Sequence, residues 1–291
     1  MATLDTPAAA LDGAPAPAYQ SIRVERHGAT GAVAEVVLTG PGKGNAFGPD
    51  FAREMPVVFA ALDKDSAVRV VVIRGAGAHF SYGLDLQAAM GQAGFTVAGE
   101  NLAAERTELY DHILYMQRSC AAVAECRKPV IAAIAGWCIG FGLDLASACD
   151  YRLCSAEARI SLREARMGIV ADMGSLQRLP YIVGEGRLRE MAYSGKDIDA
   201  AEALRIGLVN QVYDTPEDLF AATRAQAEEI AANPPLVVQG VKRVLNAGRD
   251  QSIEEGLRFV AAWNSAFMQS HDLAEAMTAF MQRRAPEFKG K

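Results

Sequence analysis

The sequence has few of the features that mark membrane-spanning or nucleic-acid-binding proteins. No apolar run is long enough to cross a bilayer. Positive charge is not in excess, because 29 Lys and Arg residues stand against 35 Asp and Glu residues and give a net charge of −6. That balance disfavours nucleic acid or an anionic membrane surface as the main partner. We therefore expect neither a nucleic-acid nor a membrane partner.

Cysteine and histidine are also scarce, and their spacing suits neither disulfides nor metal ligands. The five cysteines include no C-x-x-C pair, and the four histidines are scattered along the chain. Cysteines in apolar contexts without such spacing are typical of reduced core residues. The sequence therefore predicts no metal site.

Targeting signals are not recognisable at either end of the sequence. The N-terminus has neither the basic nor the apolar region of a secretory signal, and it carries Asp5 and Asp12 but no arginine before Arg23. The last three residues, Lys289-Gly290-Lys291, differ from a peroxisomal tripeptide. On these grounds we expect a cytoplasmic protein.

The composition that remains is that of a globular protein. The chain has 291 residues, 51% hydrophobic and 22% charged, and is long enough to bury a sizeable core. Residues 1–20 are rich in Ala and Pro, so we expect a disordered tail. The apolar run from Val68 to Arg74 predicts a strand buried on both faces. Strand patterns recur up to residue 214, and residues 215–291 have helix patterns.

Capping residues mark several predicted helix ends. Pro216 suits the first position of a helix, and Ser252 with Glu255 has the spacing of a capping box. Asp272 with Glu275 has the same spacing and predicts the start of the last helix. The segment 174–183 is predicted to form one helix.

Three of the acidic residues in the segment 136–178 stand out, because the segment is rich in Ala, Leu, Ile, Gly and Met. Asp144 lies within a helix pattern that follows the turn Gly140-Phe141-Gly142, and Glu164 and Asp172 lie on the loop beyond it. Buried acids are costly unless they are paired or used. A carboxyl group in an apolar pocket has the raised pKa that acid–base chemistry needs. The segment is therefore a candidate active site.

Each of these acids also has a structural interpretation. Glu164 could be an exposed charge or pair with Arg163 or Arg166. Asp172 precedes a predicted helix and could cap it. Asp144 could be a buried acid paired with an arginine. The residues alone leave these alternatives open.

Four motifs follow one another in a characteristic order. They are Phe80–Leu86 (FSYGLDL), Lys128–Ala132 (KPVIA), Gly140–Asp150 (GFGLDLASACD) and Ala171–Pro180 (ADMGSLQRLP). Together they resemble the crotonase (enoyl-CoA hydratase/isomerase) superfamily, and within it the Δ3,5-Δ2,4-dienoyl-CoA isomerase branch. The resemblance runs from about Ile22 to the C-terminus. It implies an α/β crotonase (ClpP-like) fold, with a spiral of ββα units over residues 21–214 and a C-terminal helical trimerisation region over 215–291.

The resemblance implies an oxyanion hole made of two backbone N–H groups. The matching positions are Leu84 and Phe141, and the second departs from the family, which usually has glycine there. These donors would hold the thioester oxygen as it gains charge. The residues implied to bind substrate are Ala46, Tyr82, Gly83 and Gly140.

The resemblance also implies roles for the three acids. Asp172 would remove the C2 proton of a 3,5-dienoyl-CoA, Glu164 would protonate C6, and Asp144 would assist in the same pocket. In the hydratases a glutamate stands at the Asp144 position and a glycine at the Asp172 position, and acids matching Asp144 and Glu164 position a water. The alternatives are therefore a hydratase acting on 2-enoyl-CoA, or an acyl-CoA-binding protein without catalysis.

The expected partners follow from the same resemblance. The substrate is an acyl-CoA thioester, so coenzyme A is part of the substrate and no separate cofactor is expected. The assembly is expected to be a homotrimer or a dimer of trimers. Candidates for contacting the coenzyme A phosphates are Lys43, Arg23 and Arg26.

Overall fold

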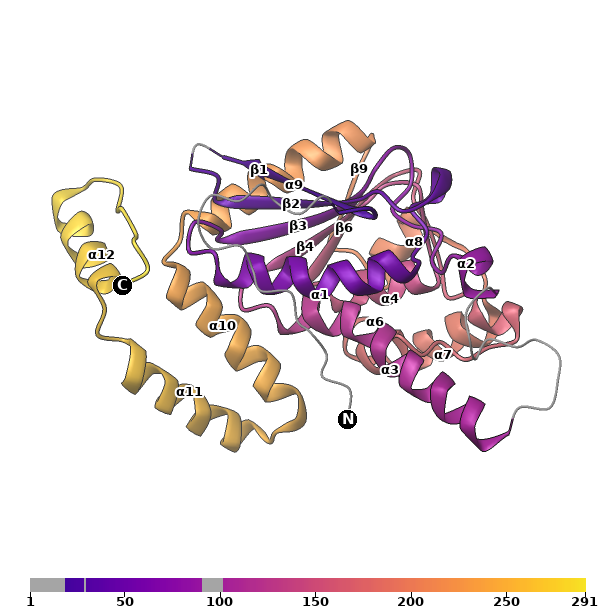
Figure 1. Cartoon of the computed structure of the whole chain (residues 1–291). Coiled ribbons are helices and arrows are strands. Elements are labelled where there is room, and N and C mark those ends of the chain that lie inside the picture. Colours follow the sequence, from indigo (N-terminus) through magenta and orange to yellow (C-terminus); the bar gives the residue numbers. More distant parts are fainter. Residues whose placement is uncertain (1–18, 29, 91–101) are drawn as a thin grey trace.

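Two β-sheets lie at the centre of the computed structural model, which describes residues 19–28, 30–90 and 102–291 (Figure 1). The predicted tail, residues 1–20, lies outside the described residues except for its last two. The larger sheet has six strands: β1 (Ile22–His27), β2 (Val33–Leu38), β3 (Val70–Gly75), β4 (Val130–Ile134), β6 (Tyr151–Ser155) and β9 (Gln211–Tyr213). β1 pairs antiparallel with β2, and the other neighbours are parallel.

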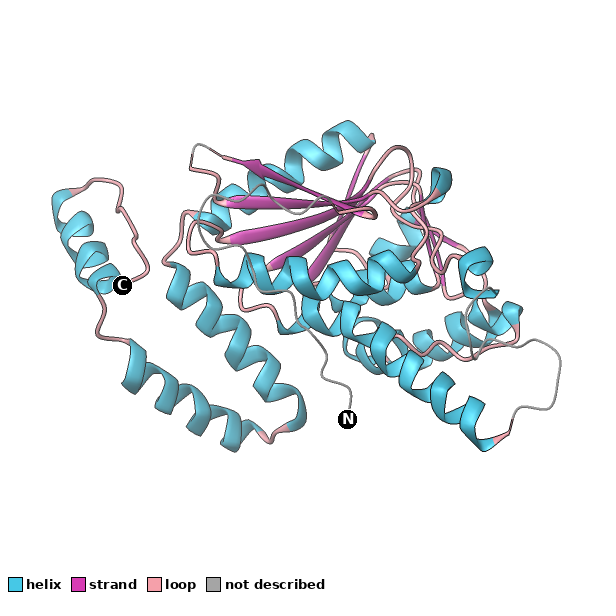
Figure 2. Cartoon of the chain, viewed as in Figure 1, coloured by secondary structure: helices cyan, strands magenta, loops and turns pink. Residues whose placement is uncertain are grey.

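The two faces of this sheet bury different side chains, because successive residues of a strand point to opposite faces. Val36 belongs to the same core cluster as Phe51 of α1. Val33 belongs to a second cluster with Leu219 of α9. The helices that cover the sheet are α1 (Pro49–Lys64), α3 (Ala103–Glu125) and α9 (Pro216–Ala231). Figure 2 shows α1 and α3 on one side of the sheet and α9 on the other.

A smaller sheet carries the turn that leads into the predicted site. It consists of β5 (Trp137–Ile139), β7 (Arg159–Ser161) and β8 (Ile198–Asp199). An isolated bridge joins Ser81 to Cys138 of β5 and another joins Phe47 to Leu84, so the loop from Phe80 to Leu86 lies beside both β5 and the loop around Phe47. The helix α4 (Phe141–Ala148) follows directly, where the sequence has a helix pattern around Asp144, and all its residues are buried.

The remaining elements of the core are short. They are η1 (Gly42–Gly44), α2 (Leu86–Met90), η2 (Glu164–Met167), α5 (Ser175–Arg178), α6 (Pro180–Val183), α7 (Glu185–Ser194) and α8 (Ala200–Arg205). The single helix predicted over 174–183 is wrong, because Pro180 lacks the N–H that would continue α5 and instead opens α6. None of the helices described here has the length and apolar character needed to cross a membrane.

The chain ends in three helices that lie beside the core rather than on the sheet. They are α10 (Pro235–Ala247), α11 (Ile253–Phe267) and α12 (His271–Gln282), with η3 (Gly248–Asp250) between the first two. Figure 1 shows α11 and α12 apart from the sheets. Lys242 of α10 is buried and donates to Asp150 at 2.8 Å, which ties α10 to the core. The helical region predicted from residue 215 thus includes α9, which packs on the sheet, and three helices that do not.

One predicted cap of these helices is confirmed and one is wrong. Ser252 and Glu255 form the capping box of α11. At α12 the N-cap is Ser270, which accepts from the N–H of Leu273. Asp272 instead accepts from two backbone N–H groups of the C-terminal tail, those of Lys289 at 2.7 Å and Gly290 at 2.8 Å. Tertiary hydrogen bonds thus override a local capping pattern here.

Candidate active site

Two loops at the carboxyl ends of β2 and β3 are joined by one asparagine. Asn45 donates from Nδ2 to the carbonyl oxygens of Ala76 and His79, at 2.9 and 2.7 Å. The backbone carbonyl of Asn45 accepts from the Ser81 hydroxyl at 2.9 Å. That hydroxyl in turn accepts from the N–H of Gly83 at 3.0 Å. Asn45 is buried and has a φ of 47°, a left-handed conformation that asparagine tolerates better than most residues. The sequence analysis missed this residue.

Two backbone N–H groups at the predicted oxyanion positions are free. The bridge between Phe47 and Leu84 uses the N–H groups of Phe47 and Asp85, at 2.8 and 3.0 Å, and leaves that of Leu84 unused. The N–H of Phe141 is the first of α4. Neither N–H donates to any described residue. Such donors at a helix N-terminus can hold a developing negative charge.

Glycine is required where these two donors come together. A Cβ on Gly83 would lie 2.6 Å from the carbonyl oxygen of Ile139 and 3.2 Å from the nitrogen of Phe141. Gly83 also has a φ of 86°. The close approach places Leu84, the next residue, beside the start of α4. Any larger residue at position 83 would separate the two loops.

The side chain of Phe141 points away from these donors and into the core. Its ring packs edge-on against Phe47 and Phe51, with centroid distances of 5.0 and 5.7 Å. Phe141 is buried. A phenylalanine in place of the family's usual glycine therefore leaves its own N–H accessible.

Glu164 lies over the turn that precedes α4. A Cβ on Gly140 would lie 2.9 Å from Oε1 of Glu164. Oε2 is buried and has no hydrogen-bond partner among the described residues. Burial, together with the negative charges of Asp144 and Asp172, raises the pKa of Glu164 to about 7. An unpaired acid of this kind can give or take a proton near neutral pH.

The predicted alternatives for Glu164 do not occur. Arg163 pairs with Asp197, with Nη2 2.7 Å from each carboxylate oxygen. Arg166 donates from Nε to the carbonyl oxygen of Ser194 at 3.1 Å. Both neighbouring arginines are therefore occupied elsewhere.

Asp144 is buried on α4, and it anchors the next loop. Its Oδ1 accepts from the N–H of Ser175 at 2.6 Å, at the first residue of α5. Burial raises the pKa of Asp144 to about 6, although the hydrogen bonds of Ser175 and the positive charge of Arg178 lower it. The predicted pairing with an arginine is thus replaced by a bond to a backbone N–H.

Asp172 lies on the loop that Asp144 anchors, and its side chain is exposed in the single chain. Gln117 of α3 donates to its backbone carbonyl at 2.7 Å. Asp172 does not cap α5, whose N-cap is Gly174. Desolvation by the surrounding protein raises the pKa of Asp172 above its usual value. The structure therefore brings all three predicted acids together, with Asp144 and Glu164 at the protein side and Asp172 at the solvent side.

The other residues predicted to bind substrate surround the same place. Tyr82 is 44% exposed and its ring lies 5.0 Å from that of His79. Ala46 directly follows Asn45, and Gly140 directly precedes Phe141. Two of the phosphate candidates are engaged in ion pairs, Arg23 with Glu25 and Arg26 with Asp65, and both lie on β1.

A second cluster of titratable residues lies on β1 and β2. Glu25, His27 and Glu35 are the one group in the described ranges that gathers three possible metal ligands. Glu35 already accepts from the guanidinium groups of Arg74 and Arg224. A cation would compete with both for one buried carboxylate, so this cluster does not favour a metal.

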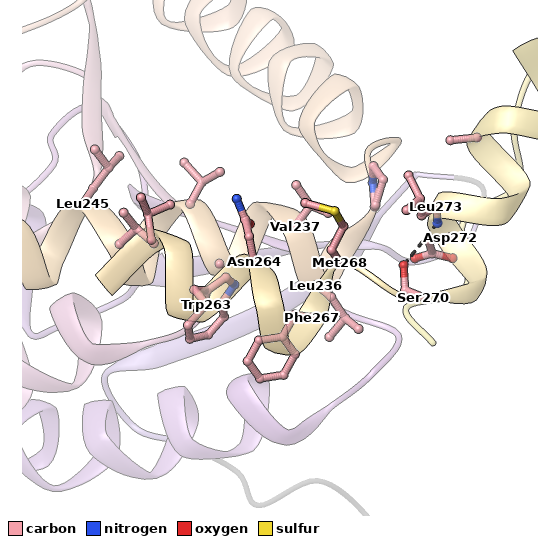
Figure 3. Close-up of a pocket in the computed structure, with 16 residues that line it drawn as sticks. Leu236, Val237, Leu245, Trp263, Asn264, Phe267, Met268, Ser270, Asp272 and Leu273 are labelled. Atoms are coloured by element: carbon pink, nitrogen blue, oxygen red, sulfur yellow. Dashed lines mark hydrogen bonds between the residues drawn. The ribbon is translucent and has the colours of Figure 1, made fainter. Parts of the chain in front are cut away.

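An apolar groove of about 400 Å³ lies between α10, α11 and α12 (Figure 3). Leu236 and Val237 of α10 and Trp263 and Phe267 of α11 line it. None of the predicted site residues lines it. It is therefore not part of the candidate active site.

The comparisons with known proteins agree with the predicted resemblance. The enoyl-CoA hydratase/isomerase family model matches residues 28–291. A mitochondrial Δ3,5-Δ2,4-dienoyl-CoA isomerase of Dictyostelium discoideum is 42% identical over 93% of this chain and 92% of that protein. A peroxisomal one of Arabidopsis thaliana is 39% identical over 93% of this chain and 97% of that protein.

Solved structures give the same result for the fold. An enoyl-CoA hydratase from Bacillus anthracis superposes with a TM-score of 0.84 at 29% identity, over 94% of this chain and all of that one. The predicted crotonase fold is thereby confirmed.

The prediction of a cytoplasmic protein is contradicted, because the isomerases named above are mitochondrial and peroxisomal proteins. The chain belongs to the enoyl-CoA hydratase/isomerase family.

Proposed function

We propose that the protein is an isomerase that converts a 3,5-dienoyl-CoA to the 2,4-dienoyl-CoA. The observation that carries the proposal is the unpaired carboxyl of Glu164, buried beside the free N–H of Phe141. An acid with a pKa of about 7 next to a free backbone donor suits proton transfer to an enolate. The identities of about 40% to dienoyl-CoA isomerases support the same reaction.

In the proposed reaction two acids move one proton each. Asp172, as the carboxylate, takes a proton from C2, and the electron pair spreads over the diene to the thioester oxygen. The N–H groups of Leu84 and Phe141 stabilise that negative charge. Glu164, as the neutral acid, gives its proton to C6. The double bonds then lie at C2 and C4, and water later restores the two carboxyl groups to their starting states.

Asp144 has a supporting part in this proposal. Its bond to the N–H of Ser175 holds the loop that carries Asp172. Its negative charge also raises the pKa of Glu164, so that Glu164 stays protonated closer to neutral pH. No redox step occurs, and we propose no cofactor besides the coenzyme A of the substrate.

We also propose that the protein assembles as a homotrimer or a dimer of trimers through its C-terminal helices. Large apolar side chains of α10 to α12 are exposed in the single chain, among them Leu245, Ile253, Leu257 and Phe280. Exposed apolar surface of this kind usually marks a protein interface.

One absorbance assay tests the proposed reaction. The purified protein is mixed with 3,5-dienoyl-CoA of several chain lengths, and the ultraviolet absorbance of the conjugated 2,4-dienoyl thioester is followed. A parallel sample with 2-enoyl-CoA reports hydration. We expect isomerisation to be the faster reaction. Rapid hydration without isomerisation would support the hydratase, and binding without either reaction would support a non-catalytic protein.

A further inference from the structure

Glu164, at the start of η2, and Arg163, its N-cap, contact different parts of the protein. Glu164 lies over Gly140, on the side of the candidate active site. Arg163 lies on the other side, where Asp197 holds its guanidinium group by three hydrogen bonds from Nε and Nη2, of 2.7 to 3.1 Å. The same guanidinium group lies over the ring of Trp137, with 5.3 Å between its carbon and the ring centroid.

Arg166 is held on the same far side. Its Nε donates to the carbonyl oxygen of Ser194, and its side chain lies against Gly195. Its positive charge contributes to lowering the pKa of Asp197, although the hydrogen bonds of Arg163 and Ser161 contribute more. Asp197 therefore faces both arginines that flank Glu164 in the sequence.

We propose that Asp197 is a positioning residue that keeps Arg163 and Arg166 away from Glu164 and so leaves the carboxyl group of Glu164 without a positive neighbour. This inference rests on the proposed role of Glu164 as the acid. Its physical basis is that an arginine within about 4–6 Å of a carboxyl group lowers its pKa by about 1–3 units. Such a neighbour would keep Glu164 ionised at neutral pH.

The charges that remain around Glu164 fit this arrangement. Besides burial, a hydrogen bond from the backbone of Glu164 itself lowers its pKa, and the charged groups that act on it are the carboxylates of Asp144 on α4 and Asp172 on the loop before α5, which raise it. The nearest cation on α5, Arg178, acts on Asp144 instead. Asp197, which follows α7, is not among the groups that act directly on the pKa of Glu164.

The test is a titration of Glu164 in four proteins. The ¹³Cδ chemical shift of Glu164, assigned by comparison with Glu164→Gln, is followed against pH in the wild type and in Asp197→Ala. Asp197→Ala frees Arg163, so we expect the pKa of Glu164 to fall by about one unit or more. Arg163→Gln is the matched control, since it breaks the same ion pair without freeing a cation, and the pKa should not fall. The double variant Arg163→Gln/Asp197→Ala should restore most of the wild-type value.

Activity gives a second readout of the same variants. A fall of one unit from about 7 reduces the protonated fraction of Glu164 at pH 7 from about a half to about a tenth, so isomerisation should fall about fivefold in Asp197→Ala. The alkaline limb of its pH profile should move to lower pH. Asp197→Glu, which keeps the negative charge, should preserve the wild-type profile.

The outcomes separate this inference from the proposed function. If the pKa of Glu164 is the same in the wild type and in Asp197→Ala, or falls equally in Arg163→Gln, the inference is wrong. If Asp197→Ala does not fold, Asp197→Asn and the double variant are titrated instead, with the same expectations. If the titrations behave as expected but the wild type does not isomerise dienoyl-CoA, the proposed function fails and the inference stands.

Discussion

The candidate active site and the C-terminal helices differ in which side chains lack a partner: polar ones at the site and apolar ones on the helices. At the site the groups without a partner are polar, because Oε2 of Glu164 and Oγ of Ser175 are buried without hydrogen bonds to described residues. In the described residues of α11 and α12 no side-chain nitrogen or oxygen is buried without a partner, while large apolar side chains such as Phe280 are exposed.

The difference suggests two different kinds of partner. Buried polar atoms without hydrogen bonds are rare in folded proteins, and a bound polar ligand is one way to satisfy them. Exposed apolar surface is satisfied by another protein surface. We therefore associate the first region with the thioester substrate and the second with further copies of this chain. The predictions below test that division, beginning with the largest expected effect.

Replacing the proposed base should remove activity without affecting the C-terminal helices. In Asp172→Asn the amide cannot accept the C2 proton, so we expect isomerisation to fall by about 10²–10⁴-fold. The absorbance of the 2,4-dienoyl product measures the rate. Asp214→Asn, at an exposed aspartate outside the site, is the control and should be fully active. Near-wild-type activity of Asp172→Asn would exclude Asp172 as the base.

Separating the two free N–H groups should have an effect almost as large. In Gly83→Ala the new Cβ would meet the carbonyl oxygen of Ile139, so the loops must move apart. We expect kcat to fall by about 10²–10³-fold, as for loss of one oxyanion donor. Gly77→Ala is the matched control. Gly77 also has a positive φ, but a Cβ added there would have no neighbour within 4 Å. If kcat falls equally in Gly83→Ala and Gly77→Ala, backbone strain alone explains the effect.

Charges on the exposed face of α11 should break the assembly. Ile253 and Leu257 are 85% and 62% exposed in the single chain. The double variant Ile253→Glu/Leu257→Glu should sediment as a monomer, because burying two carboxylates in an apolar interface is unfavourable. Glu254→Gln, on the same helix, should sediment like the wild type. A wild type that is itself monomeric at micromolar concentration would contradict the division between the two regions.

Neutralising Glu164 should stabilise the fold. Because burial raises its pKa from 4.5 to about 7, its contribution to stability is full below pH 4.5 and is lost as the pH rises through 7. Glu164→Gln should therefore increase the free energy of unfolding at pH 8 by about 1–3 kcal/mol, and by much less at pH 4. Urea unfolding at both pH values measures the difference. A loss of stability at pH 8 would mean that the carboxylate has a partner in the folded protein.

Much of the core could be predicted from local sequence. The apolar run from Val68 to Arg74 predicted a strand within two residues of the observed bounds of β3, because burial on both faces of a strand requires an unbroken apolar run. The three acids could be singled out because a charge in an apolar stretch is unusual. Their sequence positions gave no indication of which acids would be buried.

What could not be predicted depends on contacts between distant segments. Asp272 has a local capping pattern but binds the tail near Gly290. The exposure of Asp172 and the lack of a partner for Glu164 arise from how the loop after η2 packs, and Asn45 has no motif that reveals its role. Such features depend on tertiary geometry, which single-sequence patterns do not encode.

The measurement that tests the central claim most directly is the exchange of the C2 proton of 3,5-dienoyl-CoA with solvent in D₂O. We predict that Glu164→Gln still incorporates deuterium at C2 but forms almost no 2,4-dienoyl-CoA, because Asp172 can remove the proton and no acid delivers one to C6. Asp172→Asn should do neither. Exchange at C2 in Asp172→Asn at the wild-type rate would contradict the assignment of the two acids.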